Sequence, residues 1–462
     1  MLRLRQKGSN QISLIDLMLP PEATELPKDL AKIDAWLDDE RFFIPFRDKY
    51  HQCLGRPSVP AEVFLRMTAL KHQYNLSDRE VCAMVTDRIS WRYFCRIPWD
   101  KQVPHPSSLC KIRQRLDADG SDHMAELNRH LINKAQEEKI IKSRNKVRVD
   151  TTVVEANIHH PTDSSLIGDA VRVVNRLARK AAAAVGTTVR DHSRSIKKRV
   201  LKIAKVARRR TEESLQEVRQ ITGEIADIAE KTLKEASKVA HQLQQKAQTL
   251  AEEIQKKPKQ LIGRLEEAIT RGRKVIAQAR QVNAGNIKLP DRVVSIFDPD
   301  ARPIKTGKIN KETEFGYKVC LTENKERIIT SYRVMTGNPP DNAVLTSGIE
   351  EHIHNTGEMP AGVATDRGFW SRDNERILKE KMGIQKVSLP FKGKRSQQRI
   401  KYEQQFWFQR LQRWRAGQEG TISELKRRYG MGRTLYRGID GCRRWVGGAI
   451  WGYNLNRIAR LL

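Results

Sequence analysis

Residues 146–155 (KVRVDTTVVE) alternate in side-chain character and are rich in β-branched residues. This period of two is typical of a β-strand, in which successive side chains point to opposite faces. Asp150 stands in the middle of the stretch. Because burial of an unpaired carboxylate is costly, an acid in a strand is either an edge or capping residue or part of a site that supplies a counter-charge. Two further acidic positions downstream favour the second explanation.

The composition favours an anionic partner. Lys and Arg number 86 against 55 Asp and Glu among 462 residues, a net charge of +31, and nucleic acid is the usual partner of such a chain. No run of 18 apolar residues exists and the N-terminus lacks a signal-peptide core, so we expect a cytoplasmic protein without a membrane partner. Six cysteines without a Cys-x-x-Cys pair, and histidines without metal-binding spacing, do not predict a zinc site.

The first part of the chain, residues 1–135, has the pattern of short helices. A Ser cap before Pro60 and a capping box at 77–80 each open a helix, and a basic helix begins at Ser107. Three short helices with basic residues on the last resemble a helix-turn-helix module. We therefore expect an N-terminal helical DNA-binding domain, with an ordinary helical subdomain as the alternative.

The remaining chain reads as an α/β domain with a helical insertion. Residues 136–163 hold the first strand, and 164–290 are almost wholly helical in composition, with a basic stretch at 172–210. Apolar residues recur at steps of three and four over 215–254 and end near Pro258, as in a coiled coil or a solvated helical hairpin. Residues 291–462 alternate between strand and helix patterns and predict a mixed sheet flanked by helices. The strands are expected at 292–297, 317–321, 328–334, 362–368 and 384–389, and the helices at 341–354 and 372–381.

Two acids are candidates for one site, and a third is harder to choose. Asp366 ends a short apolar strand, and ligands gather beyond the carboxyl ends of the strands in α/β sheets. If that strand neighbours the one with Asp150, the two carboxylates need a cation between them. Arg415, Glu419 and Lys426 are spaced to share one helical face, although Gly417 and Gly420 weaken a helix there. An exposed salt-bridge ladder is the plainer interpretation of this set.

These motifs together resemble those of a DDE transposase of the bacterial insertion-sequence type. The resemblance covers Asp150-Thr-Thr-Val-Val-Glu155, Thr365-Asp-Arg-Gly368 and the set Arg415-x-x-x-Glu419 with Lys426, while residues 55–95 are similar to the N-terminal domain of the same transposases. One position departs from the family signature, because Gln412 stands where the family has Tyr. The helical insertion also departs, since it follows the first acid and not the second.

The resemblance implies a ribonuclease-H-like catalytic core. In that core Asp150, Asp366 and Glu419 would be catalytic and would bind two Mg²⁺ (or Mn²⁺) ions, about 3.5–4 Å apart in such sites. Glu403 and Glu424 compete with Glu419 for the third place. The resemblance further implies DNA contacts, for which the candidates are Arg415, Lys426, Arg367 and Trp370.

The implied function is a transposase that binds the terminal inverted repeats of its element, as a dimer or larger assembly on double-stranded DNA, and catalyses strand cleavage and transfer. Three alternatives remain. A relative that binds the ends without cutting would lack metal-dependent nicking. A nuclease without strand transfer would cut unrelated DNA or RNA equally well. A structural coiled-coil protein would depend on residues 215–254 and not on metal.

Overall fold

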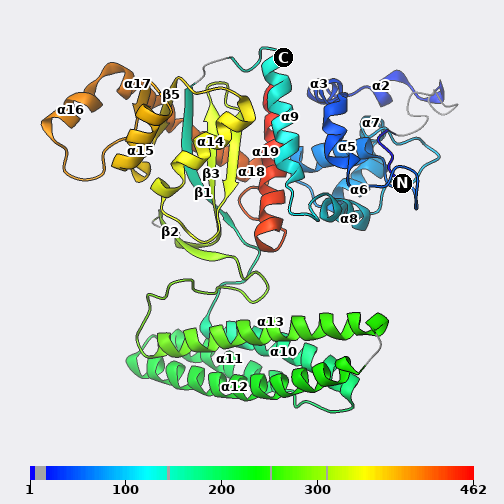
Figure 1. Cartoon of the computed structure of the whole chain (residues 1–462), viewed down its shortest axis with the longest axis vertical. Helices are drawn as coiled ribbons and strands as arrows, with labels where there is room; N and C mark the ends of the chain where they lie inside the picture. The colour runs from blue at the N-terminus through cyan, green and yellow to red at the C-terminus, as the bar shows by residue number, and fades with distance from the viewer. Residues whose placement is uncertain (6–16, 143–145, 250–251, 309–310) are drawn as a thin grey trace. The chain divides into compact units, whose positions relative to one another are not determined.

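The chain folds into two compact units in this computed structural model. The first unit contains Met1–Glu155 and Tyr317–Leu462, and the second contains Ala156–Gly316 (Figure 1). The second unit is thus an insertion into the sequence of the first. The residues that the structure describes are 1–5, 17–142, 146–249, 252–308 and 311–462.

The N-terminal part of the first unit is helical. Helix α5 is buried along almost its whole length, with Phe64, Met67 and Leu70 in the core. Short 3₁₀ and α segments lie at Glu40–Phe43 and Ile44–Arg47. The helices are α2 (Pro21–Thr24), α3 (Lys28–Leu37), α5 (Ala61–Gln73), α6 (Asp78–Asp87), α7 (Ile89–Phe94), α8 (Pro106–Leu116) and α9 (His123–Glu137).

The C-terminal helix α19 (Gly438–Leu461) packs against both α5 and α9 and against strand β4 (Figure 1). Glycines make this close packing possible. A Cβ atom at Gly448 would lie 2.2 Å from Nε2 of His72 on α5, and one at Gly447 would lie 2.3 Å from the hydroxyl oxygen of Tyr332 on β4. The last helix of the chain therefore joins the N-terminal helices to the sheet.

The sheet of the first unit is mixed. Strand β1 lies between β3 and β5, β6 lies beyond β5, and β4 pairs with β3. The pairs β1–β5 and β5–β6 are parallel, and β3–β4 is antiparallel. The bounds are β1 (Lys146–Glu155), β3 (Lys311–Asn324), β4 (Ile329–Val334), β5 (Gly362–Thr365) and β6 (Lys386–Ser388).

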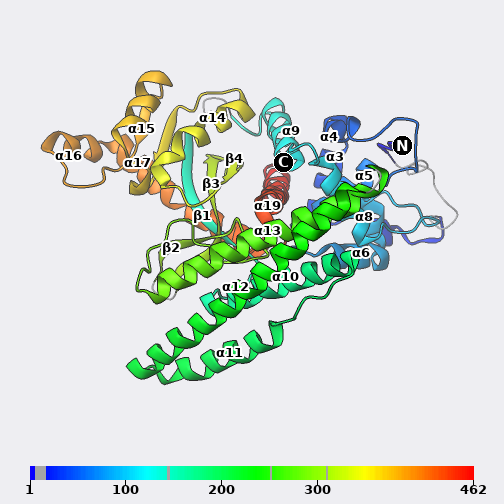
Figure 2. The same cartoon turned by 60° about the horizontal axis from the view of Figure 1, so that its bottom comes forward.

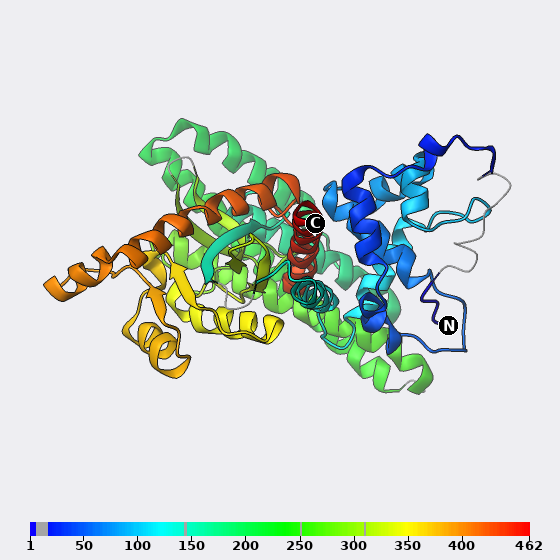
Figure 3. The ribbon, with the colours of Figure 1, turned by 90° about the horizontal axis from the view of Figure 1, so that it is seen from above.

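Helices cover both faces of this sheet (Figure 3). Helix α14 packs on β4, while α17 packs on β5 and β6 and α18 packs on β1. Val147, Val149, Val363 and Phe369 form the centre of the buried cluster between the layers. The helices are α14 (Leu345–Thr356), α15 (Arg372–Arg376) with a π-helical continuation over Ile377–Lys381, α16 (Gln397–Gln404), α17 (Phe406–Ala416) and α18 (Gln418–Arg428), with 3₁₀ turns at Asp341–Ala343 and Arg367–Phe369.

The second unit is a helical bundle that also carries a β-hairpin arm (Figure 2). Helices α10 and α12 pack on α13, and the apolar stripe expected along 215–254 is buried at Ile221, Ile225 and Leu233. Leu250 of that stripe lies outside the described residues. Strand β2 (Arg302–Lys308) pairs antiparallel with the first part of β3. The helices are α10 (Asp163–Val185), α11 (Ser193–Val206), a 3₁₀ turn at Ala207–Arg209, α12 (Glu212–Gln248) and α13 (Glu252–Asn283).

Two local expectations are wrong. Residues 292–297 form no strand, because the backbone N–H and C=O of Val293 bond to the Gln278 side chain and Val293 and Ile296 pack on the bundle. Pro258 does not end a helix but lies inside α13. In the second turn of a helix, its missing N–H removes a single intrahelical bond, which the packed bundle tolerates. No helix among the described residues is long and apolar enough to cross a membrane.

Candidate active site

The ends of β1 and β5 bring two carboxylates together. The parallel register pairs Val149 with Thr365, so Asp150 and Asp366 are the next residues on adjacent strands. Asp150 Oδ1 accepts a hydrogen bond of 2.8 Å from the N–H of Thr151, and Asp366 Oδ1 accepts one of 2.8 Å from the N–H of Gly368. The backbone therefore orients both side chains, and the strands that carry them are neighbours, as the sequence led us to expect.

Both acids hold their protons more tightly than usual. Burial, followed by the charge of Asp366, raises the pKa of Asp150 to about 7 against the opposing effect of Arg415. Burial also raises the pKa of Asp366, with a further rise from the carboxylate of Asp341. Two carboxylates in one low-dielectric site resist joint ionisation unless a cation joins them. The pair thus has the electrostatic character of a cation-binding site.

A third carboxylate, Asp341, faces this pair and was missed by the sequence reasoning. Its Oδ1 accepts a hydrogen bond of 2.8 Å from the hydroxyl of Thr151 and pairs with Nζ of Lys318 at 2.7 Å. A Cβ atom at Gly368 would lie 2.9 Å from Oδ2 of Asp341 and 3.1 Å from Oδ1 of Asp366, so a glycine is needed between them. The sequence signal at Asp341, an acid after Pro-Pro and before a helix, also fits a helix cap.

The third predicted acid, Glu419, stands at the protein surface. Its side chain is 73% exposed, and its Oε1 lies 3.6 Å from the guanidinium of Arg415. The same guanidinium lies 3.5 Å from Oδ2 of Asp150. Arg415 therefore links the predicted third acid to the strand-end pair, while Glu419 itself remains open to solvent.

The expected single helix through these residues is interrupted at Gly417, which separates α17 from α18. A Cβ atom at Gly417 would lie 2.8 Å from the guanidinium of Arg148, which donates to the carbonyl of Trp414 at 2.5 Å. Close approach thus explains this glycine, whereas the same test at Gly420 finds open space. Arg415 consequently lies on α17, and Glu419 lies on α18.

A buried ion pair in the sheet contacts α18. Arg148 of β1 and Glu323 of β3 pair at 2.6 Å, with side chains only 3% and 0% exposed. The hydroxyl of Thr421 on α18 donates to Oε1 of Glu323 at 3.0 Å. Removal of either charged partner would leave a poorly compensated buried charge, so the ion pair is important for stability, and α18 is joined to it through Thr421.

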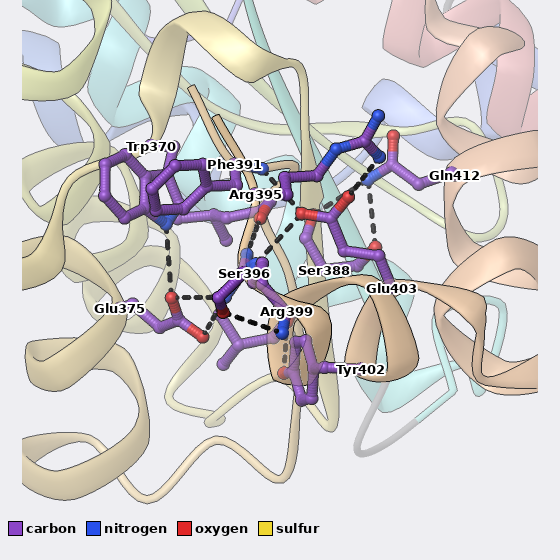
Figure 4. Close-up of polar contacts among 12 residues, drawn as sticks. Trp370, Glu375, Ser388, Phe391, Arg395, Ser396, Arg399, Tyr402, Glu403 and Gln412 are labelled. Carbon is purple, nitrogen blue, oxygen red and sulfur yellow. Dashed lines mark hydrogen bonds and ion pairs between the residues drawn. The ribbon is translucent and has the colours of Figure 1, made fainter. Parts of the chain in front are cut away.

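Gln412, at the position where the family signature has Tyr, bonds to the strand ends. Its Nε2 donates to the carbonyl of Thr365 at 3.1 Å and to the carbonyl and hydroxyl oxygens of Ser388 at 2.9 Å each. Figure 4 shows the contact with Ser388. The amide therefore ties α17 to β5 and β6.

The predicted DNA-contacting residues lie in different settings. Arg367 is exposed in the turn after Asp366, and Lys426 is half-buried in the last turn of α18. Trp370 packs on Phe391 with ring centroids 4.1 Å apart and donates from Nε1 to Glu375 at 3.2 Å (Figure 4). Phe391 and Glu375 therefore hold the indole ring of Trp370 in place, the first through a ring contact and the second through its N–H.

The competing acids have structural partners. Glu403 accepts from the N–H of Phe391 at 2.7 Å and pairs with Arg399 at 2.9 Å, and these bonds hold the pKa of Glu403 below its usual value despite burial (Figure 4). Glu424 lies 3.6 Å from Arg428 and 4.0 Å from Arg327. Both carboxylates are occupied by cations away from the strand ends.

The donor set at the strand ends fits a hard divalent cation, since Mg²⁺ prefers carboxylate oxygens and keeps several waters. Among the described residues, however, no group of three or more Asp, Glu, His or Cys side chains converges closely enough to hold a metal ion. A metal site built on Asp150 and Asp366 would therefore need a further ligand, from a movement of Glu419, from Asp341 or from oxygens of a substrate.

Comparison with known proteins adds two family matches. A model described as "Transposase domain (DUF772)" matches residues 20–115, and one described as "Transposase DDE domain" matches residues 376–459. The second match contains Glu419. The chain is 30% identical over 135 residues to "Uncharacterized protein ORF8 in nfe locus" of Rhizobium meliloti. That alignment covers 28% of this chain and 64% of the relative. No solved structure matches the chain.

Proposed function

We propose that this chain, which its two family matches indicate to be an insertion-sequence DDE transposase, binds the inverted repeats of its element and cuts and joins DNA strands there. The observation that carries the proposal is the buried carboxylate pair at the ends of β1 and β5. A strand order of β4, β3, β1, β5 and β6, with β1, β5 and β6 parallel, supports a ribonuclease-H-like core.

In this proposal Asp150, Asp366 and Glu419 hold two Mg²⁺ or Mn²⁺ ions. When bound there, divalent metal would activate a water or the 3′-hydroxyl of the DNA and would stabilise the charge that develops on the leaving oxygen. The strand register brings the carboxylates together and burial leaves them poorly hydrated, which strengthens their attraction for a cation. Arg415, which lies 3.5 Å from Oδ2 of Asp150, would pair with a phosphate oxygen once the acids have a cation as counter-charge.

The DNA contacts extend over other parts of the chain. We propose that Arg367, Trp370 and Lys426 contact the strand near the cut, and that the helices of residues 20–115 recognise the repeats. On α8, Lys111 and Arg115 are exposed, whereas Arg113 is buried and bonds to Asp78. Lys111 and Arg115 are therefore the candidates there. The protein is proposed to act as a dimer or larger assembly on DNA.

The test is a cleavage assay on labelled duplexes that carry the ends of the element. With Mg²⁺ the proposal predicts nicks at the element boundary, no cutting of an unrelated duplex, and joining of the released 3′-ends to a plasmid target. Equal cutting of both duplexes would instead indicate a nuclease without strand transfer.

A second candidate function is that of an end-binding protein that does not cut. The exposure of Glu419 and the lack of a closed three-ligand group among the described residues favour it. In the same assay such a protein would shift end-bearing DNA in a gel, yet it would leave both strands intact with either Mg²⁺ or Mn²⁺.

A further inference from the structure

A cavity of about 480 Å³ adjoins the carboxylate pair. Its walls include Asp341 and Gly368, which also border the Asp150–Asp366 site. The volume lies within the roughly 300–1,000 Å³ that is usual for pockets of small ligands. The cavity therefore lies beside the carboxylate pair, and Asp341 and Gly368 separate the two.

The rim of the cavity is cationic. Lys318, Arg372 and Lys392 line it, and Lys318 is already paired with Asp341. Arg372 and Lys392 are exposed, and neither has a carboxylate partner among the described residues. Arginine and lysine side chains without partners next to a cavity suit a phosphate, which an arginine binds through two parallel hydrogen bonds.

The aromatic wall of the cavity is held in place by a polar network (Figure 4). Trp370 lines the cavity and donates to Glu375, which also accepts from Arg399 at 2.8 Å and from Lys379 at 2.7 Å. Burial opposes ionisation of Glu375, but the bonds from Lys379 and Arg399 keep its pKa below the usual value.

The same network fixes the other side of the wall. Glu403 accepts from Arg399 and from the N–H of Phe391, whose ring packs on Trp370 and whose neighbour in sequence is Lys392. The aromatic surface is therefore positioned before any ligand arrives, and the backbone next to Lys392 is held with it.

We propose that this cavity binds one nucleotide of the DNA strand beside the phosphate that the carboxylate pair engages. Its phosphate would lie against Arg372 and Lys392, and its sugar or base against Trp370. Aromatic faces accept any base by stacking, so this subsite would position the strand without reading its sequence. The proposal deepens the proposed function and rests on it.

The test compares Arg372→Ala and Lys392→Ala with a matched control, Arg376→Ala. Arg376 lies one turn further along α15, is exposed, pairs with Asp373 at 3.2 Å and does not line the cavity. Binding of a fluorescent end-bearing duplex would be measured by anisotropy at several salt concentrations, in EDTA so that no strand is cut.

We expect each cavity variant to weaken binding by about fivefold or more and to lower the salt dependence, because one phosphate contact contributes a slope of roughly 0.7–0.9 in the logarithm of the binding constant. The control should match the wild type. Equal behaviour of Arg372→Ala, Lys392→Ala and Arg376→Ala would overturn the proposal.

The aromatic contact is tested with 2-aminopurine placed on either side of the scissile phosphate. Stacking on Trp370 should quench its fluorescence at one of the two positions, and Trp370→Leu should remove that quenching while Trp370→Phe retains part of it. Quenching that is the same in Trp370→Leu would contradict the proposal, as would adenosine monophosphate that binds the cavity without displacing the duplex.

Failure of this inference is distinguishable from failure of the proposed function. A wild-type protein that neither binds nor cuts end-bearing DNA would refute the proposed function. A protein that binds and cuts that DNA, but whose cavity variants behave as the control does, would refute the nucleotide subsite alone.

Discussion

The ends of strands β1 and β5 and the beginning of helix α18 differ in how they present an acid. The side chain of Asp150 is 14% exposed. Asp150 and Asp366 directly follow Val149 and Thr365, which pair in the parallel register of β1 and β5. Glu419, in contrast, is 73% exposed and lies beside Arg415 at 3.6 Å. The sheet positions the carboxylates at the ends of β1 and β5, whereas the exposed side chain of Glu419 can adopt several rotamers.

This difference predicts different roles for the strand-end acids and for Glu419. A buried pair with raised pKa values is unfavourable until a cation arrives, and its geometry is fixed by backbone hydrogen bonds. An exposed glutamate on a helix must lose side-chain freedom to join them, which is a cost that bound DNA and metal can offset. We therefore expect the strand ends to determine metal binding and Glu419 to complete the site.

The largest effect should follow from neutralising the strand-end acids. We expect Asp150→Asn and Asp366→Asn each to reduce cleavage of end-bearing DNA by about a thousandfold or more, as loss of one preorganised catalytic group does elsewhere. End binding in a gel should persist. Glu424→Gln, on the same helix as Glu419 but paired with Arg327 and Arg428, should cut normally. Cleavage by Asp150→Asn at the wild-type rate would remove that residue from the site.

The next prediction concerns the buried ion pair between Arg148 and Glu323, which contacts α18 through Thr421. Glu323→Ala leaves the guanidinium of Arg148 buried without its partner, and such losses cost about 3–5 kcal/mol. Thr421→Ala removes a single hydrogen bond to Glu323, and its cost should be roughly 1 kcal/mol. Urea unfolding measures both. If Glu323→Ala destabilises the protein no more than Thr421→Ala does, the ion pair contributes no more to stability than the single hydrogen bond.

Changing side-chain length should separate the two regions. Asp150→Glu adds a methylene to a packed, buried position, and overpacking forces shifts that cost roughly 1–3 kcal/mol. Glu419→Asp shortens an exposed side chain, which its surroundings tolerate. We expect the first variant to lose about a hundredfold in cleavage rate and the second about tenfold or less. Equal losses would mean that both acids are held equally rigidly once DNA is bound.

The smallest effect concerns stability without metal. Because the pKa of Asp150 is about 7 in the folded protein against 3.8 ordinarily, the folded state holds this proton where the unfolded state has lost it. Stability therefore falls as pH rises from about 4 to 7 and then stays level. In EDTA at pH 8, the free energy of unfolding of Asp150→Asn should exceed that of the wild type by about 1–3 kcal/mol. The difference should vanish near pH 4, and an equal difference at both pH values would contradict the assignment.

Local patterns made the strand-end pair predictable. Alternation identified the strand of Asp150, an apolar run ending in an acid identified that of Asp366, and the parallel pairing of such strands follows from ordinary α/β topology. The stripe along 215–254 likewise predicted buried helices. The strand and helix patterns depend on residues close together in the sequence, whereas the pairing of the two distant strands was expected from topology alone.

Features set by distant contacts were not predictable in the same way. Gly417 lies against Arg148 of β1, and Gln412 of α17 bonds to Ser388 of β6. In the sequence Asp341 fits a helix cap, and only the fold shows that it accepts a hydrogen bond from the hydroxyl of Thr151. The apolar run 292–297 failed as a strand for the same reason, because a glutamine side chain from α13 bonds to its backbone.

The most direct test of the account is the binding of Mn²⁺ to the protein with a pre-cleaved DNA end, followed by electron paramagnetic resonance. If Asp150 and Asp366 together hold the metal, both Asp150→Asn and Asp366→Asn should weaken Mn²⁺ binding by about tenfold or more, in the range seen when a metal site loses a supporting group. Glu424→Gln should bind Mn²⁺ as the wild type does. Unchanged Mn²⁺ affinity in both aspartate variants would contradict the claim that the ends of β1 and β5 form the metal site.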